Sequence, residues 1–284
     1  TSNAVKNNVE TILQAQADYL KNRLGITKLV IPKLPVIPLG IHTNKFSFSS
    51  LKKSMSRQEL EILPDELVVL YVGRLSFHAK AHPLVMYEAL ERAALNCQKK
   101  IVLIECGWHA NDYIKDAFSQ GSKAGCPSVR TVFLDGRLEK NRTLAWSSAD
   151  IFCSISDNIQ ETFGIVPLEA MAAGLPVVVS DWDGYKDTVR DGIDGFRIPT
   201  IAPQPGLAGD LAQRHALGVD TYDMYCGYSS SLIGVQARML TNAFEQLFKS
   251  KELRMKMGES GRERASQYYD WKITFTCTAN THPY

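Results

Sequence analysis

The 284-residue chain is long enough for one large domain, or for two small ones, with a sizeable hydrophobic core. Apolar residues make up 45% of it and charged residues 22%, and these proportions exclude a disordered or fibrous chain. The 32 Lys and Arg residues nearly balance the 30 Asp and Glu residues, so the net charge of +2 argues against a nucleic acid partner. No apolar stretch approaches the roughly 20 residues of a transmembrane span.

The six cysteines form no Cys-x-x-Cys pair, and most of them lie in apolar runs. This usage is typical of buried, reduced thiols, so we expect a cytoplasmic protein. A peripheral position at the inner face of the membrane stays open for a full-length protein. The six positions are Cys97, Cys106, Cys126, Cys153, Cys226 and Cys277.

The N-terminal part of the chain predicts one helix followed by a connector, together covering residues 5–45. Residues 1–4 look like a remnant of cloning at the start of a fragment, and we leave them out of the fold prediction. Apolar positions at helical spacing predict an amphipathic helix over residues 8–24. Three prolines then bar a central sheet position and predict an extended connector: Pro32, Pro35 and Pro38.

Short β-branched runs alternate with helical stretches over residues 46–271, which indicates a parallel sheet. We therefore expect an α/β fold with a doubly wound, mainly parallel, six-stranded Rossmann-like sheet and terminal helices. Strands are predicted at residues 67–72, 101–105, 129–134, 151–154, 176–180 and 195–198. Residues 200–231, rich in Pro and Gly, interrupt the alternation. Residues 272–284 form an atypical tail without a helical pattern.

The loop after the first predicted strand carries two basic residues where open parallel sheets bind their ligands. It has no G-x-G-x-x-G, and the chain has no P-loop, which argues against a dehydrogenase and a P-loop NTPase. Arg74 offers a planar fork and Lys80 a point charge, and both can converge on one diphosphate. Each residue alone could also be an ordinary surface charge.

A second loop, after the fourth predicted strand, leads into a helix that begins near Gly164. Pro167 is tolerated in a first helical turn, and Gly174 marks the end of that helix. The free N–H groups at its start form a positive pole that can bind a phosphate. These groups belong to Phe163, Gly164, Ile165 and Val166.

Two glutamates flank this helix start. Glu169, in about the first turn, could accept hydrogen bonds from the two hydroxyls of a ribose, and Glu161, before the helix, could face a sugar. The alternative is that Glu169 complements the helix dipole while Glu161 caps or solvates the loop.

With these residues the sequence resembles the C-terminal, donor-binding lobe of the family-four retaining glycosyltransferases of the GT-B fold. The similarity covers about residues 30–270. It is carried by Gly73-Arg74-Leu75 with Lys80, and by the Glu-x7-Glu pair followed by residues 170–178. The resemblance implies that Arg74 and Lys80 hold the donor diphosphate, that Glu161 meets the donor sugar and that Glu169 meets the ribose. The implied catalytic groups are Glu161, Arg74 and Lys80.

The resemblance further implies the donor-binding half of an enzyme that moves a sugar from a nucleoside-diphosphate sugar, with UDP or GDP the expected nucleotide. The acceptor, a glycan, lipid or small molecule, would bind an N-terminal lobe that is missing from this chain. We therefore expect the isolated chain to be inactive in transfer. No cofactor and no metal are implied. A nucleotide-sugar 2-epimerase-like isomerase and a non-catalytic nucleotide-binding lobe remain the alternatives.

Other motifs near the predicted strand ends are less specific. Asp181-Trp182-Asp183 matches the metal-binding D-x-D of the unrelated GT-A enzymes, but Asp183 could be an ordinary N-cap. The loop after the third strand is predicted to border the nucleobase through Gly136, Arg137 and Leu138. Trp108 and His109 are expected to be structural. Three tyrosines could line the cleft or simply cover the surface: Tyr222, Tyr225 and Tyr228.

Overall fold

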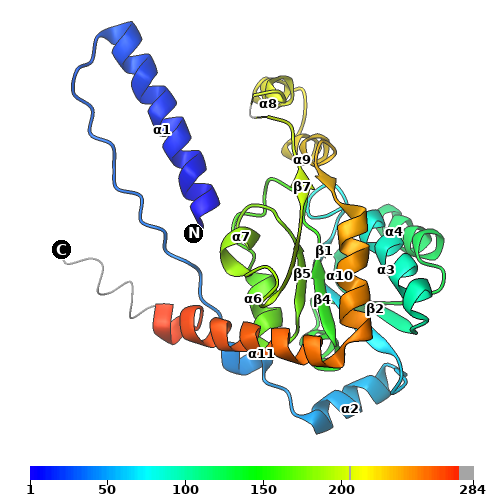
Figure 1. Ribbon diagram of the computed structural model, residues 1–284. Helices are drawn as coiled ribbons and strands as arrows, with labels where there is room; N and C mark the ends of the chain where they lie inside the picture. Colours follow the sequence, from blue (N-terminus) through cyan, green and yellow to red (C-terminus); the bar gives the residue numbers. More distant parts are fainter. Residues whose placement is uncertain (205, 275–284) are drawn as a thin grey trace.

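Six parallel strands form the central sheet, in the order β3-β2-β1-β4-β5-β6 (Figure 1). The computed structural model of the chain describes residues 1–204 and 206–274. The chain moves outward from β1 to β3 and returns to β4 on the other side of β1, so the predicted doubly wound sheet is confirmed. The strands are β1 (Leu67–Leu75), β2 (Ile101–His109), β3 (Arg130–Asp135), β4 (Ile151–Ser154), β5 (Val177–Ser180) and β6 (Gly195–Ile198).

Helices cover both faces of the sheet (Figure 1). Alternate strand residues enter opposite cores: Val68 and Leu70 belong to one core, and Val69 lies in the other. This double burial explains the unbroken apolar runs of the strands. One core includes residues of α5 (Glu139–Ser148), α6 (Ile165–Ala172) and α7 (Tyr185–Thr188). The other includes residues of α3 (Leu84–Cys97), α10 (Ala237–Lys249) and α11 (Lys251–Tyr268), while α4 (Asp112–Gly125) packs beside α3.

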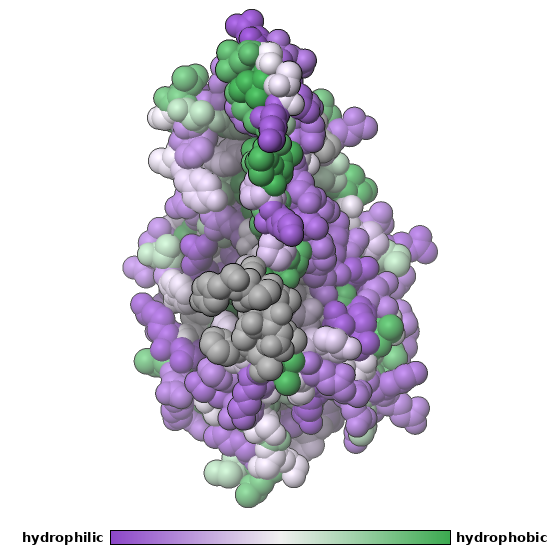
Figure 2. Space-filling view, turned by 90° about the vertical axis from the view of Figure 1, so that its left-hand side faces the viewer, coloured by the Kyte–Doolittle hydropathy of each residue, from purple (hydrophilic) through white to green (hydrophobic). Residues whose placement is uncertain are grey.

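The first helix, α1 (Asn3–Leu24), corrects the predicted N-terminal boundary. Residues 2–4, which we left out of the fold, belong to it, because the buried Ser2 is the N-cap and its hydroxyl also donates to the Thr162 carbonyl at 2.7 Å. Beyond this anchor α1 stands away from the sheet (Figure 1). Figure 2 shows the side of the molecule that lies to the left in Figure 1, and apolar and hydrophilic side chains are mixed over its upper part. Ile12 and Tyr19 of α1 are exposed.

The connector and the end of the chain meet beside the sheet. Two short helices follow the connector, η1 (Thr43–Phe46) and α2 (Ser50–Glu59). The N–H of Ile41 donates to the Tyr269 carbonyl at 2.7 Å, and the N–H of Trp271 donates to the Ile41 carbonyl at 3.0 Å. Residues 271–274 form a helical turn, so the expectation of a non-helical tail is wrong there, because Asp270 accepts backbone hydrogen bonds from this turn. The remaining tail lies outside the described residues.

The segment that interrupts the alternation is built from regular elements instead of a plain loop. A two-stranded antiparallel sheet, β7 (Thr200–Ile201) with β8 (Gly234–Val235), closes its base. Between these strands lie α8 (Gly209–Ala216) and α9 (Tyr222–Ser230), which project beyond the sheet at the top of Figure 1. Arg214 of α8 donates two hydrogen bonds, of 2.7 and 2.8 Å, to Asp220 in the loop between the two helices.

The cysteines fit the prediction of reduced thiols as far as the described residues reach. Four of them are buried, and Cys97 is partly exposed, and these five form no disulfide. Cys277 lies outside the described residues. None of the helices within residues 1–204 and 206–274 is long and apolar enough to cross a membrane. The buried four are Cys106, Cys126, Cys153 and Cys226.

The carboxyl group of Glu105 is buried on the side of the sheet that α3 covers. Glu105 of β2 is 1% exposed and accepts a 2.7 Å hydrogen bond from the Tyr87 hydroxyl. Burial raises the pKa of Glu105 to about 8, although the hydrogen bond from Tyr87 opposes this. The folded state therefore favours the protonated acid, whereas the unfolded chain loses that proton near pH 4.5.

We predict that Glu105→Gln removes a pH dependence of stability. In the wild type the contribution of Glu105 is fully present below about pH 4.5 and is lost as the pH rises toward 8. The unfolding free energy of the variant minus that of the wild type should therefore increase by on the order of 1–4 kcal/mol from pH 5 to pH 8. Urea unfolding at both pH values measures it. A pH-independent difference would contradict the assignment.

Candidate functional site

A pocket of about 410 Å³ lies at the carboxyl edge of the sheet, where the ends of β1 and β2 meet the loops after β1, β3 and β4. Its position is the topological switch point, at which open α/β sheets bind ligands. The two basic residues predicted to hold a diphosphate, Arg74 and Lys80, both line it. The other residues on its wall include Gly73, Gly107, Trp108, Gly136, Arg142, Ser156, Asn158, Gln160, Glu161 and Val166.

Arg74 is held by the loop that follows β4. One of its terminal nitrogens donates to Gln160 Oε1 at 3.1 Å and to the Ala79 carbonyl at 3.3 Å. Gln160 thereby fixes the guanidinium over the pocket, and Asn158 supports the same region by donating to the His78 carbonyl at 3.0 Å. The two predicted ligand loops are therefore joined by one hydrogen bond between side chains and one from a side chain to the backbone.

Lys80 and Glu161 form a direct ion pair on the pocket wall. Glu161 is 8% exposed, and a second donor, the Tyr185 hydroxyl, lies 3.1 Å from the same carboxylate oxygen. Tyr185 also shares a 2.8 Å hydrogen bond with Ser154 Oγ. Burial, followed by the negative charge of Glu161, raises the pKa of Tyr185 well above its ordinary value, so this phenol stays protonated and donates.

The start of α6 matches the predicted helix boundary. Gly164 is the N-cap with φ +88°, and Pro167 is the third residue of the helix. A Cβ at Gly164 would lie 2.4 Å from two ring carbons of Tyr185, so both the backbone conformation and the close approach require glycine. Of the four predicted N–H positions, Val166 lines the pocket, whereas Phe163 is buried against Tyr269.

Glu169 lies on α6, within reach of the electrostatic field of Arg142. Burial raises the pKa of its carboxyl group to about 7, and Arg142 partly offsets this shift. Arg142 itself lines the pocket and donates to the Gly136 carbonyl at 2.7 Å. Glu169 is not among the residues that line the pocket. Among the described residues, none donates a hydrogen bond to its carboxylate.

The predicted nucleobase loop is only partly at the pocket. Gly136 lines it, and a Cβ there would meet the Gly107 backbone at 3.0 Å. Arg137 instead turns to Asp135, with contacts of 2.7 to 3.2 Å, and Leu138 is 56% exposed away from the pocket wall. Neither side chain is among the residues that line the pocket.

Trp108 corrects one expectation, since it lines the pocket and is 42% exposed rather than structural. In the register of the sheet it lies beside Arg74, a relation that its position after the second strand could have indicated. His109 is structural as expected, because its ring packs between Phe118 and Phe133 at 5.5 and 5.8 Å. Arg142 was missed because it lies one helix away from the loop residues.

The D-x-D segment does not form the predicted cap. The N-cap of α7 is Gly184, and Asp183 precedes it with a left-handed φ of +36°. Asp181 lies 3.5 Å from Arg197 as an ion pair. Within residues 1–204 and 206–274, no three His, Cys, Asp or Glu side chains are grouped so as to hold a metal ion.

The three tyrosines of α9 do not line this pocket: Tyr222 and Tyr225 pack on His215, and Tyr228 lines a separate cavity.

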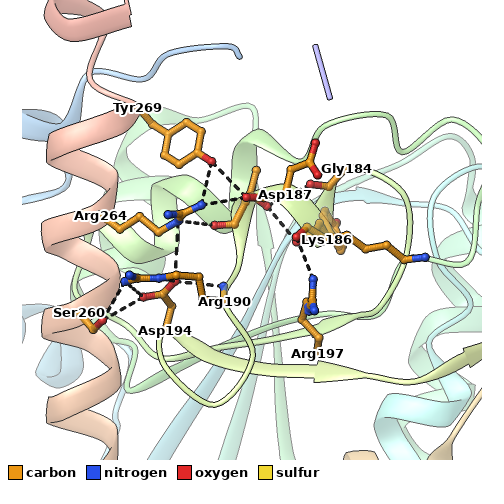
Figure 3. Close-up of polar contacts among 11 residues, drawn as sticks. Gly184, Lys186, Asp187, Arg190, Asp194, Arg197, Ser260, Arg264 and Tyr269 are labelled. Carbon is orange, nitrogen blue, oxygen red and sulfur yellow. Dashed lines mark hydrogen bonds and ion pairs between the residues drawn. The ribbon is translucent and has the colours of Figure 1, made fainter. Parts of the chain in front are cut away.

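A polar network from α11 holds α7, and hence Tyr185, in place (Figure 3). Asp194, with no exposed surface, accepts hydrogen bonds of 2.7 to 3.1 Å from Arg190 and Ser260. Arg264 of α11 donates to the Thr188 and Asp187 carbonyls at 3.1 and 3.0 Å. These bonds satisfy the last carbonyl groups of α7, which is too short to be stable alone.

The chain is similar to known proteins in sequence and in fold. Residues 52–204 match the family described as "Glycosyl transferases group 1". Because this match spans more than half of the chain, the chain belongs to that family of glycosyltransferases.

Two curated relatives are phosphatidyl-myo-inositol mannosyltransferases. That of Mycobacterium tuberculosis strain H37Rv is 38% identical over 167 residues, which are 59% of this chain and 40% of the relative. That of Mycobacterium leprae is 29% identical over 206 residues, 72% of this chain and 43% of the relative. The matched part is thus less than half of the length of these curated relatives.

Solved structures share the fold at low sequence identity. Anabaena HepE, in complex with UDP and glucose, has a TM-score of 0.59 and 20% identity, covering 85% of this chain and 55% of HepE. The C-terminal domain of a group 1 glycosyl transferase from Francisella tularensis has a TM-score of 0.55 and 16% identity, covering 82% of this chain and 100% of that domain. The resemblance to a C-terminal GT-B lobe is therefore confirmed.

We predict that Gly164→Ala lowers the unfolding free energy by about 2–4 kcal/mol, because the left-handed backbone is strained and the new methyl displaces the Tyr185 ring. Gly192→Ala is the matched control, since Gly192 has φ +71° and nothing within 4 Å of an added Cβ. That control should cost only about 1–2 kcal/mol. Equal losses in urea unfolding of the two variants would rule out the Tyr185 contact as the constraint.

Proposed function

We propose that this chain is the donor-binding half of a retaining glycosyltransferase that uses a nucleoside-diphosphate sugar and needs no metal ion. The observation that carries the proposal is the convergence of Arg74, Lys80 and the start of α6 on one pocket, with Glu161 at its wall. Fixed positive groups of this kind are suited to a diphosphate. UDP or GDP is the expected nucleotide.

The proposed chemistry assigns a separate role to each group. Departure of the nucleotide builds negative charge on its diphosphate, and preorganised positive groups stabilise that charge. Arg74 and Lys80 supply them, together with the first N–H groups of α6. Glu161 would accept hydroxyl hydrogen bonds from the donor sugar, and a phosphate oxygen would compete with it for the Lys80 ammonium.

The nucleoside would occupy the part of the pocket away from Lys80. Glu169 would accept hydrogen bonds from the ribose hydroxyls, which requires its ionised form. Trp108 offers an exposed aromatic ring, and Arg142 offers a guanidinium, on the same wall. The base would border Gly136, whose missing side chain leaves the wall open there.

The acceptor side of the reaction is proposed to belong to a further lobe. The chain matches less than half of the length of these curated relatives. Within the described residues, no second sheet of comparable size is present. We therefore expect the isolated chain to bind nucleotide but to transfer little sugar. Efficient turnover by the chain alone would contradict this division of roles.

A thermal-shift panel with UDP, GDP, ADP, NAD and manganese tests the proposal first. A ligand at about 100 times its Kd adds about 2.7 kcal/mol to the folded state, which raises Tm by several degrees. We expect a shift with UDP or GDP that is the same with and without manganese. A shift only with NAD, a strict need for manganese, or no shift with any nucleotide would contradict the proposal.

We predict that Arg74→Ala weakens the binding of UDP or GDP by about 1–3 kcal/mol, the scale of a lost charge-assisted hydrogen bond. Arg92→Ala is the matched control, because Arg92 is exposed on α3 and its loss changes the net charge equally. Isothermal titration calorimetry at one salt concentration measures both. Equal affinities for the two variants would return Arg74 to an ordinary surface role.

We also predict that Glu169 gives nucleotide binding a pH dependence. Its pKa is about 7, so below that pH the carboxyl group is mostly protonated. It must then lose its proton before it can accept hydrogen bonds from both ribose hydroxyls. Wild-type affinity should therefore fall by up to about tenfold from pH 8 to pH 6, relative to Glu169→Gln. Titration of the nucleotide phosphate cancels in this ratio. A ratio independent of pH would exclude contact with Glu169.

A further inference from the structure

A second cavity, of about 630 Å³, borders the same two loops as the donor pocket. Neighbouring residues of one loop line the two spaces: Phe77 and His78 line the cavity, and Ala79 and Lys80 line the pocket that holds the proposed donor site. Residues of α9, which belongs to the segment that interrupts the strand–helix alternation, form one wall of the cavity. Its volume lies within the range of about 300–1,000 Å³ that is typical of small-molecule sites.

Asp157, in the loop that follows β4, is a buried acid on the wall of this cavity. It is 8% exposed, and its Oδ2 atom accepts a long 3.5 Å hydrogen bond from the His82 N–H. Its other oxygen, Oδ1, is fully buried and has no hydrogen-bond partner among the described residues. Burial raises the pKa of Asp157 to about 6. An unpartnered buried acceptor is costly, and a ligand that donates a hydrogen bond would offset this cost.

The lining of the cavity selects against anions and favours an uncharged, hydroxyl-bearing ligand. Among its described lining residues none is Lys or Arg, and a second carboxylate, Asp223, excludes a phosphate group further. Phe77 and Tyr228 contribute aromatic rings, and Ser230 contributes a hydroxyl. Carboxylate acceptors, hydroxyl groups and aromatic faces together match a sugar ring, whose hydroxyls donate while its C–H face packs on a ring.

The α9 wall of the cavity is connected to the donor pocket. A Cβ on Gly227 would meet His78 Cβ at 3.1 Å, so α9 packs closely on the first ligand loop. Gln160 Nε2 lies 3.2 Å from Cys226 Sγ of α9, while Gln160 Oε1 accepts from Arg74. One side chain thus joins the wall of the cavity to the guanidinium that faces the proposed diphosphate.

We propose that this cavity is a subsite for one uncharged sugar ring of the acceptor carbohydrate, bound by Asp157 and flanked by Phe77 and Tyr228. The inference rests on the proposed function, because it assigns the ring to the acceptor of that reaction. It places part of the acceptor recognition on the donor-binding lobe itself, beside the loop that carries Lys80.

Saturation-transfer NMR on the intact chain tests the subsite with three probes: the methyl α-glycosides of glucose, mannose and galactose. We expect transfer to at least one of them in the wild type. Asp157→Ala should lower that signal by at least about fivefold, which corresponds to the loss of one hydrogen bond. Met224→Trp, which fills the cavity from α9, should abolish it. Asp116→Ala, an exposed change on α4, is the control and should leave the signal unchanged.

Nucleotide thermal shifts on the same samples separate this inference from the proposed function. Met224→Trp should keep the wild-type shift with UDP or GDP, which shows that the variant is folded and that the donor pocket is intact. The subsite is refuted if no glycoside binds while a nucleotide does, or if the glycoside signal survives in both cavity variants. Asp157-dependent binding of spermidine without any glycoside binding would identify a cation site and would also refute it. If neither UDP nor GDP raises the Tm of the wild type, the proposed function is contradicted, whatever the glycosides do.

Discussion

The ion pair between Lys80 and Glu161 is the interaction on which the arrangement of the pocket depends. It joins the loop after β1 to the loop after β4, across the switch point of the sheet. A carboxylate as buried as that of Glu161 would be destabilising without a cation and a hydrogen-bond donor, and Lys80 and Tyr185 provide them. Tyr185 is positioned by α7, which Arg264 fastens to α11. The stability of a distant helix therefore supports the geometry of two short loops.

The sheet and the principal pocket residues were predictable because they depend on local patterns and on one general rule. An unbroken apolar run such as residues 67–72 is expected for a strand that is buried on both faces. This is the situation of a strand in a parallel sheet that helices cover on both sides. Parallel strands all end at one edge, so Arg74, Lys80 and Glu161 had to lie near one another once the strands were assigned. The start of α6 followed from Pro167, whose position in a first helical turn costs no hydrogen bond.

The remaining features depend on contacts between distant parts of the chain. The place of Trp108 beside Arg74 could have been predicted, but its exposure could not, because a tryptophan at the end of an apolar strand is usually largely buried. Arg142 reaches the pocket only because α5 packs against the end of β3. The helices α8 and α9 have weak local signals, and α9 is held by the contacts of Gly227 and Gln160. Ser2 becomes an N-cap next to Thr162, an anchor 160 positions away in the sequence.

The bridge between Ile41 and Asp270 has a mechanical consequence. The connector and the segment after α11 are held together by two backbone hydrogen bonds, and the Trp271 ring covers Gly40 so closely that an added Cβ would lie 2.8 Å from it. A load on either segment is therefore shared with the other one and with the core beneath them, because Ile41 and Tyr269 are both buried in the core that contains Val68.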